Sequence, residues 1–83
     1  MPPLSPAHVA FGDAMRSRRR ELGISQERLA EESGLHRTYI GMVERGERNI
    51  ALFNILRLAT ALGASAADLV AAAEQAHGQR PRR

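Results

Sequence analysis

The sequence predicts an all-α fold, a compact globule of five short helices, from two observations. Apolar residues recur at spacings of three, four and seven, which is the repeat of one helical face, and nowhere settle into the alternation of a strand. Glycines and capping residues separate these periodic stretches and give each one a start and a stop. The 83 residues suffice for one small hydrophobic core, so we expect a single domain.

The first predicted helix covers residues 6–22. Ser5 and Pro6 suit its N-cap and first position, because a serine oxygen can bond a free amide and proline lacks an N–H that would go unpaired there. The expected inward face consists of Phe11, Met15 and Leu22. Residues 1–5 include two prolines and little that could pack, so we expect a flexible N-terminus.

Two short helices are predicted next, over residues 26–33 and 36–45. Gly34 lies between them, where a positive φ is cheap only for glycine, and the arrangement matches a helix-turn-helix motif. The residues expected to pack inward are Leu29, Ala30, Leu35, Ile40 and Val43. A plain helical hairpin would share this spacing, but it gives no reason for Gly41, which costs ~1 kcal/mol relative to alanine inside a helix. Close approach of another macromolecule to an outward Gly41 would be such a reason.

Two further helices complete the predicted fold, over residues 52–62 and 66–76. The inward stripe of the fourth is expected to be Leu52, Ile55, Ala59 and Leu62. Ala51 stands at its cap position and offers no side-chain acceptor. The domain therefore spans residues 6–76, and the arginine-rich tail, residues 77–83, is expected to be disordered.

Composition limits the environment of the protein. Cysteine is absent, which excludes disulfides and thiolate metal sites. No apolar run reaches the ~18 residues of a membrane span, and no signal-peptide pattern begins the chain. We expect a cytoplasmic location and no membrane partner. The net charge of +3 resides in the tail, because residues 1–74 hold equal numbers of arginine and acidic residues, so total charge says little about binding partners.

Enzyme chemistry is not indicated. His8, His36 and His77 are scattered and lack the spacing of metal ligands. The sequence contains no glycine-rich phosphate loop and no serine–histidine arrangement that suggests a nucleophile with its base. We therefore expect no catalytic residue, no metal, no cofactor and no small-molecule ligand.

The head of the third predicted helix carries a run of hydrogen-bonding side chains. Arg37 can donate two parallel bonds to guanine, a pairing worth ~1–3 kcal/mol of discrimination. Thr38 can meet a base edge or a thymine methyl, or it can bond locally in the first turn. His36 can cap the helix or touch a DNA backbone. This cluster indicates that the head of the helix contacts another macromolecule. If that is double-stranded DNA, the expected base-reading residues are Arg37 and Thr38; a solvated Arg37 is the alternative.

Residues 25–63, SQERLAEESGLHRTYIGMVERGERNIALFNILRLATALG, resemble the lambda-repressor-like, or Xre, helix-turn-helix family. The stretches HRTYI and ERGERN are most similar to controller proteins of restriction–modification systems. With the flanking helices, the resemblance covers about residues 8–73. It implies a five-helix domain whose third helix enters the DNA major groove, acting as a homodimer on a two-half-site operator to control transcription. Autoregulation of a nearby operon is a hypothesis taken from the same resemblance.

The resemblance also implies roles for individual residues. The side chains expected on the DNA backbone are Gln26, His36, Tyr39, Arg48 and Asn49. Tyr39 could instead only pack under its helix. Glu44 would repel DNA as a free carboxylate, and the family pattern pairs it with a first-helix arginine, which matches Arg16. We expect a structural ion pair between Glu44 and Arg16.

Phe53 departs from the family pattern, which has a polar residue there. It lies off the inward stripe of its helix, and a large exposed apolar side chain suggests a contact site. We expect Phe53 and Leu56, with Leu69 or Val70, to form a dimer interface, unless Phe53 folds back onto its own core. The rival functional hypothesis is a protein-binding module, such as the antitoxin of a toxin–antitoxin pair, or an adaptor that has lost DNA binding.

Overall fold

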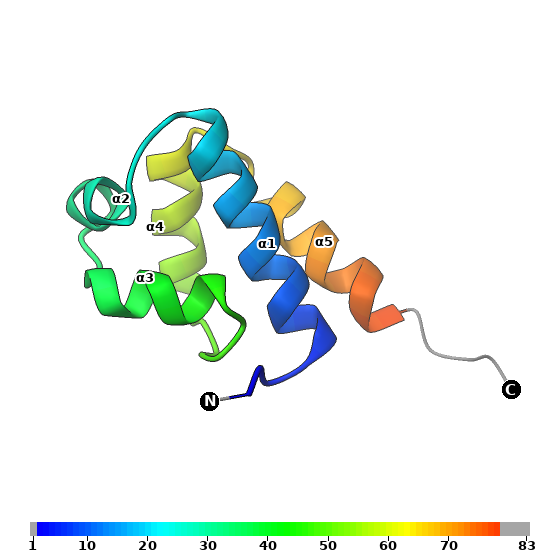
Figure 1. Ribbon diagram of the computed structural model, residues 1–83. Coiled ribbons are helices and arrows are strands. Elements are labelled where there is room, and N and C mark those ends of the chain that lie inside the picture. The colour runs from blue at the N-terminus through cyan, green and yellow to red at the C-terminus, as the bar shows by residue number, and fades with distance from the viewer. Residues whose placement is uncertain (1, 79–83) are drawn as a thin grey trace, which may run out of the picture.

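The computed structural model describes residues 2–78 and folds them into five α-helices with no strand among these residues (Figure 1). The helices are α1 (Pro6–Glu21), α2 (Gln26–Ser33), α3 (Arg37–Glu44), α4 (Leu52–Leu62) and α5 (Ala66–Gly78). The predicted all-α architecture is confirmed. The predicted tail, 77–83, lies outside the described residues except for its first two, which continue α5.

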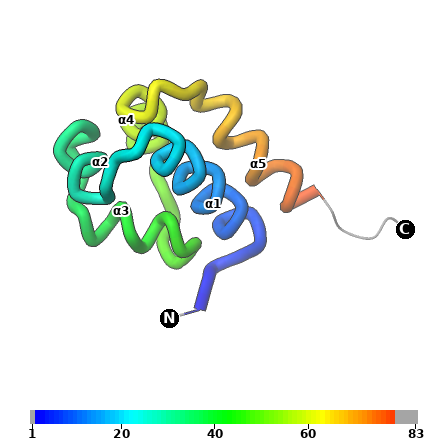
Figure 2. Tube along the Cα trace, turned by 45° about the horizontal axis from the view of Figure 1, so that its top comes forward, coloured from blue at the N-terminus to red at the C-terminus, as the bar shows by residue number. Residues whose placement is uncertain are grey.

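The helices pack around one apolar core. α1 lies along α5 and runs opposite to it, while α2 and α3 lie on the other side of α1, as both ribbon and tube show (Figures 1 and 2). The buried apolar side chains are Phe11, Met15, Leu29, Ile40, Val43, Leu58, Ala59, Leu62 and Leu69. Every helix contributes to this set, so the core fixes α3 in place through one of its sides.

The turn between α2 and α3 has the predicted geometry. Gly34 adopts a φ of 75°, in the left-handed region, and its backbone N–H bonds the carbonyl of Ala30 to close the end of α2. Ser25 caps the start of α2 by accepting from the amide of Arg28. α4 begins at Leu52, and its N-cap residue, Ala51, makes no side-chain capping bond, as the sequence predicts.

α1 and α3 approach each other at Gly12, a buried position that helical periodicity does not single out. A Cβ built on Gly12 would lie 2.5 Å from the carbonyl oxygen of Val43 and 2.7 Å from the carbonyl carbon of Glu44. These are backbone atoms and cannot swing aside, so any larger residue at Gly12 would force the two helices apart. This close contact aligns the arginines of α1 with the C-terminal end of α3.

In the segment before α1, the backbone N–H of Leu4 donates to the carbonyl of Gly46 at 2.8 Å. Two expectations about inward-facing residues are wrong. Leu22 and Leu52 are 41% and 72% exposed, and Leu58 fills the core from α4. Both exposed leucines follow the apolar repeat, but a repeat defines only a face and does not show whether another helix covers its end.

No helix within residues 2–78 has the length and apolarity needed to cross a bilayer.

Candidate nucleic-acid interface

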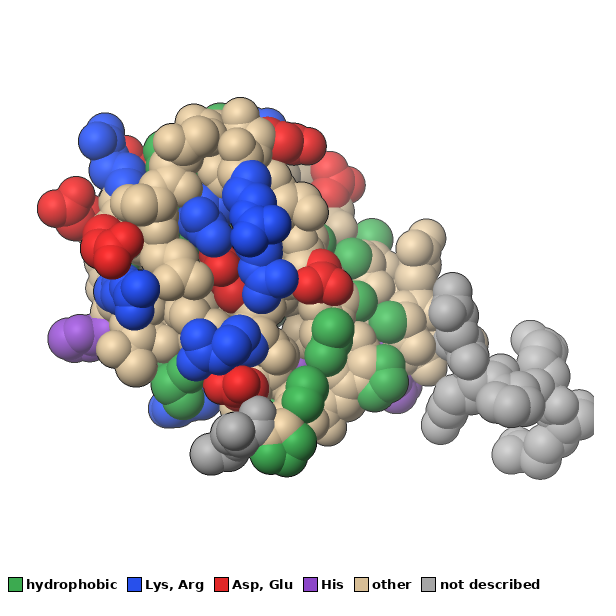
Figure 3. Space-filling view, in the orientation of Figure 1, with side chains coloured by type: hydrophobic (Ala, Val, Ile, Leu, Met, Phe, Trp, Pro, Cys, Tyr) green, Lys and Arg blue, Asp and Glu red, His purple; other side chains and the backbone are tan. Residues whose placement is uncertain are grey.

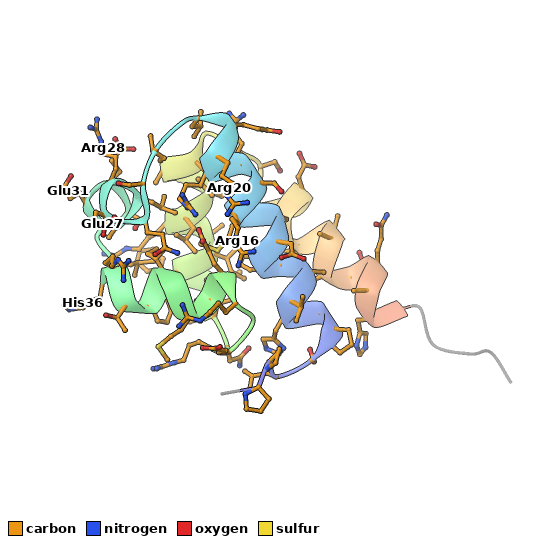
Figure 4. The ribbon with its side chains drawn as sticks, viewed as in Figure 1. Arg16, Arg20, Glu27, Arg28, Glu31 and His36 are labelled. Carbon is orange, nitrogen blue, oxygen red and sulfur yellow. The ribbon has the colours of Figure 1, made fainter. Side chains whose placement is uncertain are left out.

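The outer side of α3 presents the predicted reading residues. Arg37 and Thr38 are exposed in its first turn, whereas Ile40 and Val43 are buried on the opposite side. His36 occupies the N-cap position with extended backbone but makes no side-chain capping bond, so its imidazole does not cap α3. In Figure 4 His36 lies at the free end of α3. A rigid helix therefore offers a polar end to an incoming macromolecule.

Arg37 is joined to α2 by an ion pair. Its Nε donates to Oε2 of Glu27 at 3.0 Å, and the two side chains are 57% and 67% exposed. The pKa of the Glu27 carboxyl is lowered by the bond from its own backbone N–H and by the charge of Arg37, which together outweigh the opposing effect of desolvation. This pair spans the two helices of the motif and was not predicted from the sequence.

Tyr39 is half-buried and also carries polar contacts, so packing and polar roles coexist. Its hydroxyl oxygen accepts from Nδ2 of Asn54 at 3.2 Å, which leaves its own O–H free to donate. The guanidinium of Arg48 lies 5.6 Å from the ring centroid, a cation–π distance. Tyr39 thereby places Arg48, from the turn after α3, beside the head of the helix.

Asn49 connects the same turn to the start of α1. Its Oδ1 accepts from Nε2 of His8 at 3.0 Å, and Nδ1 of that histidine lies 2.7 Å from the hydroxyl of Ser5. The amide nitrogen of Asn49 remains available for a partner. Helical periodicity gave no role to His8, because its partner is 41 residues away in the chain.

Among the described residues, no group of three His, Asp or Glu side chains could hold a metal ion.

Glu44 lies at the centre of a buried ion cluster. Its carboxylate accepts from Nε of Arg19 at 2.7 Å and from Nη2 of Arg19 at 3.0 Å, a bidentate arrangement. Arg16 is also a partner, with Nε 3.5 Å from Oε1 and a 2.9 Å bond to the carbonyl of Glu44. The predicted Arg16–Glu44 pair exists, but the main partner is Arg19. The two arginines are three residues apart on α1 and so share the face that meets α3.

Opposing effects set the protonation of Glu44. Burial raises the pKa of its carboxyl, but hydrogen bonds from Arg19 and Gln26 and the charges of Arg19 and Arg16 outweigh that effect, so the pKa is lowered. The same bond raises the pKa of the Arg19 guanidinium against a smaller effect of burial. The cluster is therefore ionised near neutral pH, and it ties the end of α3 to α1.

The surroundings of Gln26 and Gly41 differ from those expected from the sequence, which were the DNA backbone for Gln26 and an outward, open position for Gly41. The Gln26 amide nitrogen donates to Glu44 at 2.9 Å, so this side chain is held at the start of α2. Gly41 is buried rather than open to DNA, since a Cβ there would lie 3.2 Å from Nη1 of Arg45 and 3.7 Å from Oε1 of Gln26. The missing side chain at Gly41 makes room for these two neighbours, which cover it.

Positive side chains gather over α1 and α3 on one face of the molecule (Figure 3). Arg16 and Arg20 both project from α1 on this face (Figure 4), and Arg20 is exposed. The run of arginines at the end of α1 is visible in the sequence, but it reads there only as a complement to the helix dipole. The fold adds that part of this run lies on the same face as the outer side of α3.

Large apolar side chains are exposed on α4 and α5. Phe53, Leu56 and Val70 are 65%, 46% and 42% exposed. Phe53 does not fold back onto the core, and the guanidinium of Arg57 lies 5.1 Å from its ring centroid. Leu69 is only 4% exposed and belongs to the core. Of the two alternatives on α5, Val70 is therefore the one exposed for an interface.

Comparison with known proteins gives consistent matches. A family model described as Helix-turn-helix matches residues 15–69. The control protein C.SmaI of Serratia marcescens is 55% identical over 60 residues, which cover 72% of this chain and 71% of the relative. The crystal structure of the restriction–modification controller C.AhdI of Aeromonas hydrophila is 53% identical, with a TM-score of 0.73 over 75% of this chain and 94% of that one.

A second controller structure includes DNA. The restriction–modification controller C.Esp1396I was crystallised as a tetramer with its natural 35 base-pair operator. It is 28% identical to this chain and has a TM-score of 0.75, over 86% of this chain and 93% of that one. The matched regions in all three relatives include α2 and α3 of the present fold, as the extent of coverage requires.

Proposed function

The chain belongs to the Helix-turn-helix family, and from that premise we propose that it is a controller-type transcription regulator that binds double-stranded DNA. The observation that carries this proposal is the outer side of α3. Arg37 and Thr38 are exposed in its first turn, while the opposite side of the helix is locked into the core. A rigid helix with an exposed arginine and threonine fits the width and the donor–acceptor pattern of the major groove.

Two sets of side chains flank α3 and suit the two DNA strands that border the groove. Gln26 lies at the start of α2, whose amides also suit a phosphate. Tyr39, Arg48 and Asn49 lie together on the other side, and each retains a donor for a phosphate oxygen. His36 is exposed at the head of α3 and joins the predicted backbone contacts. Phosphate contacts would supply much of the affinity, which should therefore fall steeply with salt.

A homodimer would double this surface. Phe53 and Leu56 on α4 and Val70 on α5 are exposed apolar side chains, and the proposed dimer forms through a two-fold contact that buries them. Such a dimer would read two half-sites about 34–36 Å apart. Control of its own operon, through its concentration and this dimerisation, completes the proposal. No observation above favours the antitoxin or adaptor alternatives.

Fluorescence anisotropy with two DNA duplexes tests whether the protein binds DNA and whether Arg37 contacts a base. One duplex is selected from a randomised pool by the wild-type protein, and the other has random sequence. Arg37→Ala should weaken binding to the selected duplex about 5- to 100-fold and to the random duplex much less, because a base contact carries sequence information. Arg48→Ala should weaken both equally. Arg28→Ala is the control, since Arg28 pairs with Glu32 along α2.

If Arg37→Ala lowers the affinity for both duplexes by the same factor, Arg37 does not contact a base. If the wild-type protein selects no sequence from the pool and shows no salt-dependent binding, the proposed function itself is wrong.

Analytical ultracentrifugation tests the dimer. Phe53→Ala should raise the dimer dissociation constant about 10-fold or more, as truncation of a central aromatic contact commonly does. Leu4→Ala is a matched control, because Leu4 is also exposed, at 52%, but lies beside the turn after α3. A dimer that dissociates equally in both variants, or in neither, would remove Phe53 from the interface.

A further inference from the structure

The ion pair between Glu27 and Arg37 lies on the outer surface of the helix-turn-helix. Glu27 belongs to the first turn of α2, Arg37 is the first residue of α3, and the contact is 3.0 Å long. Figure 4 shows Glu27 beside α2, above the head of α3. A carboxylate on a DNA-facing surface is unfavourable beside phosphates, so its presence there calls for a physical reason.

The geometry of the contact leaves the reading edge of Arg37 available. A guanidinium has five N–H donors in a fixed plane, and Glu27 engages Nε. The terminal nitrogens, Nη1 and Nη2, still offer two parallel donors, which is what guanine O6 and N7 accept. Anchoring at Nε also fixes the direction in which the guanidinium plane extends from α3. Glu27 therefore restrains Arg37 without occupying its outer edge.

The same restraint disfavours sequence-independent contacts. An unrestrained arginine is long and can turn to the nearest phosphate, which every DNA sequence provides. Held by Glu27, Arg37 cannot move to a phosphate without breaking the ion pair, whereas a guanine contact lets the pair persist. The carboxylate of Glu27 additionally repels nearby phosphates. The restraint acts more strongly against random DNA than against a site with guanine at the right position, whereas the repulsion applies to any DNA.

We propose that Glu27 is a specificity-determining positioning residue, which holds Arg37 for guanine and weakens its use on phosphate. This inference rests on the proposed function, since it requires that α3 binds DNA and that Arg37 meets a base. The first-turn location of Glu27 suits the role, because the amide end of α2 stabilises a carboxylate there. The helix thus stabilises the carboxylate in addition to Arg37.

The test compares Glu27→Gln with Glu31→Gln. Glu31 is exposed on the same helix one turn later, so both variants remove one negative charge from α2 (Figure 4). Dissociation constants are measured by anisotropy for the selected duplex and for random duplex of equal length, at two salt concentrations. Glu27→Gln should tighten random binding and lower the ratio of selected to random affinity about 5-fold or more. Glu31→Gln should leave that ratio unchanged, because a general charge effect applies to any DNA.

A second set of variants tests whether Glu27 affects DNA selectivity through Arg37. In an Arg37→Ala background, Glu27→Gln should cause no further loss of selectivity, since its action passes through Arg37. Glu27→Asp, which keeps the charge but shortens the side chain, should lose part of the selectivity. Circular dichroism melting of each variant verifies that the fold is intact.

Three results would overturn the inference while leaving the proposed function in place. These are an unchanged ratio for Glu27→Gln, a change equal to that of Glu31→Gln, and a further loss in the Arg37→Ala background. If the wild-type protein shows no selective binding at all, the proposed function fails, and the role of Glu27 fails with it.

Discussion

Two carboxylates of the helix-turn-helix each bind an arginine, yet their surroundings give them different uses. Glu44 is 1% exposed and its partner Arg19 is 12% exposed, whereas Glu27 and Arg37 are both more than half exposed. In the buried pair, each charge depends on the other because water cannot replace a missing partner. In the exposed pair, water or a ligand can replace either partner at little cost.

The difference in burial between the two ion pairs shows where in the fold a contact can change its partner. The Glu44 cluster fixes the end of α3 against α1, and its carboxylate is buried. The Glu27 pair stands at the opposite end of α3, where the proposed DNA contacts lie. The helix α3 is thus fixed at its C-terminal end and adjustable at its head. Four predictions test this contrast, from the largest expected effect to the smallest.

Glu44→Ala should have the largest effect on stability. It leaves two arginines of α1 facing a buried cavity without their counter-charge, and breaking such a pair costs about 3–5 kcal/mol. Urea unfolding followed by circular dichroism measures the loss. Glu31→Ala, an exposed glutamate of α2, serves as the control. Equal losses in the two variants would mean that the buried cluster does not stabilise the fold.

Arg19→Ala should destabilise the protein more than Arg16→Ala. Arg19 makes two short bonds to the carboxylate, while Arg16 makes one 3.5 Å contact and a bond to a backbone carbonyl. We expect about 2–3 kcal/mol for Arg19→Ala and about 1 kcal/mol for Arg16→Ala in the same urea assay. The reverse order would restore Arg16 as the main partner of Glu44.

Acidification should weaken the buried pair. The folded-state pKa of Glu44 is lowered, so its contribution is present above the unfolded value of about 4.3 and is lost as pH falls through the folded value. The difference in urea midpoint between the wild-type protein and Glu44→Gln should therefore shrink steadily below that pH. A difference that stays constant from pH 7 to pH 3 would show that ionisation of Glu44 contributes nothing to stability.

Glu27→Gln should leave stability almost unchanged. Its carboxylate is exposed, so the partner arginine returns to water when the pair is lost. The urea midpoint should match that of the wild-type protein within error, at the same time as DNA selectivity falls. A clear loss of stability would mean that both ion pairs are structural and that the contrast between them is false.

The sequence by itself determined the fold class, the positions of the helices and the head of α3. Local signals carry all three: the apolar repeat, Gly34 at the turn, and polar residues where the repeat demands none. The exposure of Phe53 was also predictable, because its position off the stripe of α4 is a local property. These predictions needed no knowledge of which helices touch.

Only the tertiary structure decided which partners meet. Glu44 binds Arg19 as its main partner, in addition to Arg16. Leu69 is buried, whereas Val70 is exposed. His8 forms a hydrogen bond with Asn49, which is 41 residues away in the chain. Each outcome depends on the relative placement of two helices or of a helix and a turn, which a one-dimensional repeat does not encode. Gly12 shows the physical reason, since the absence of one side chain there sets how closely α1 and α3 approach.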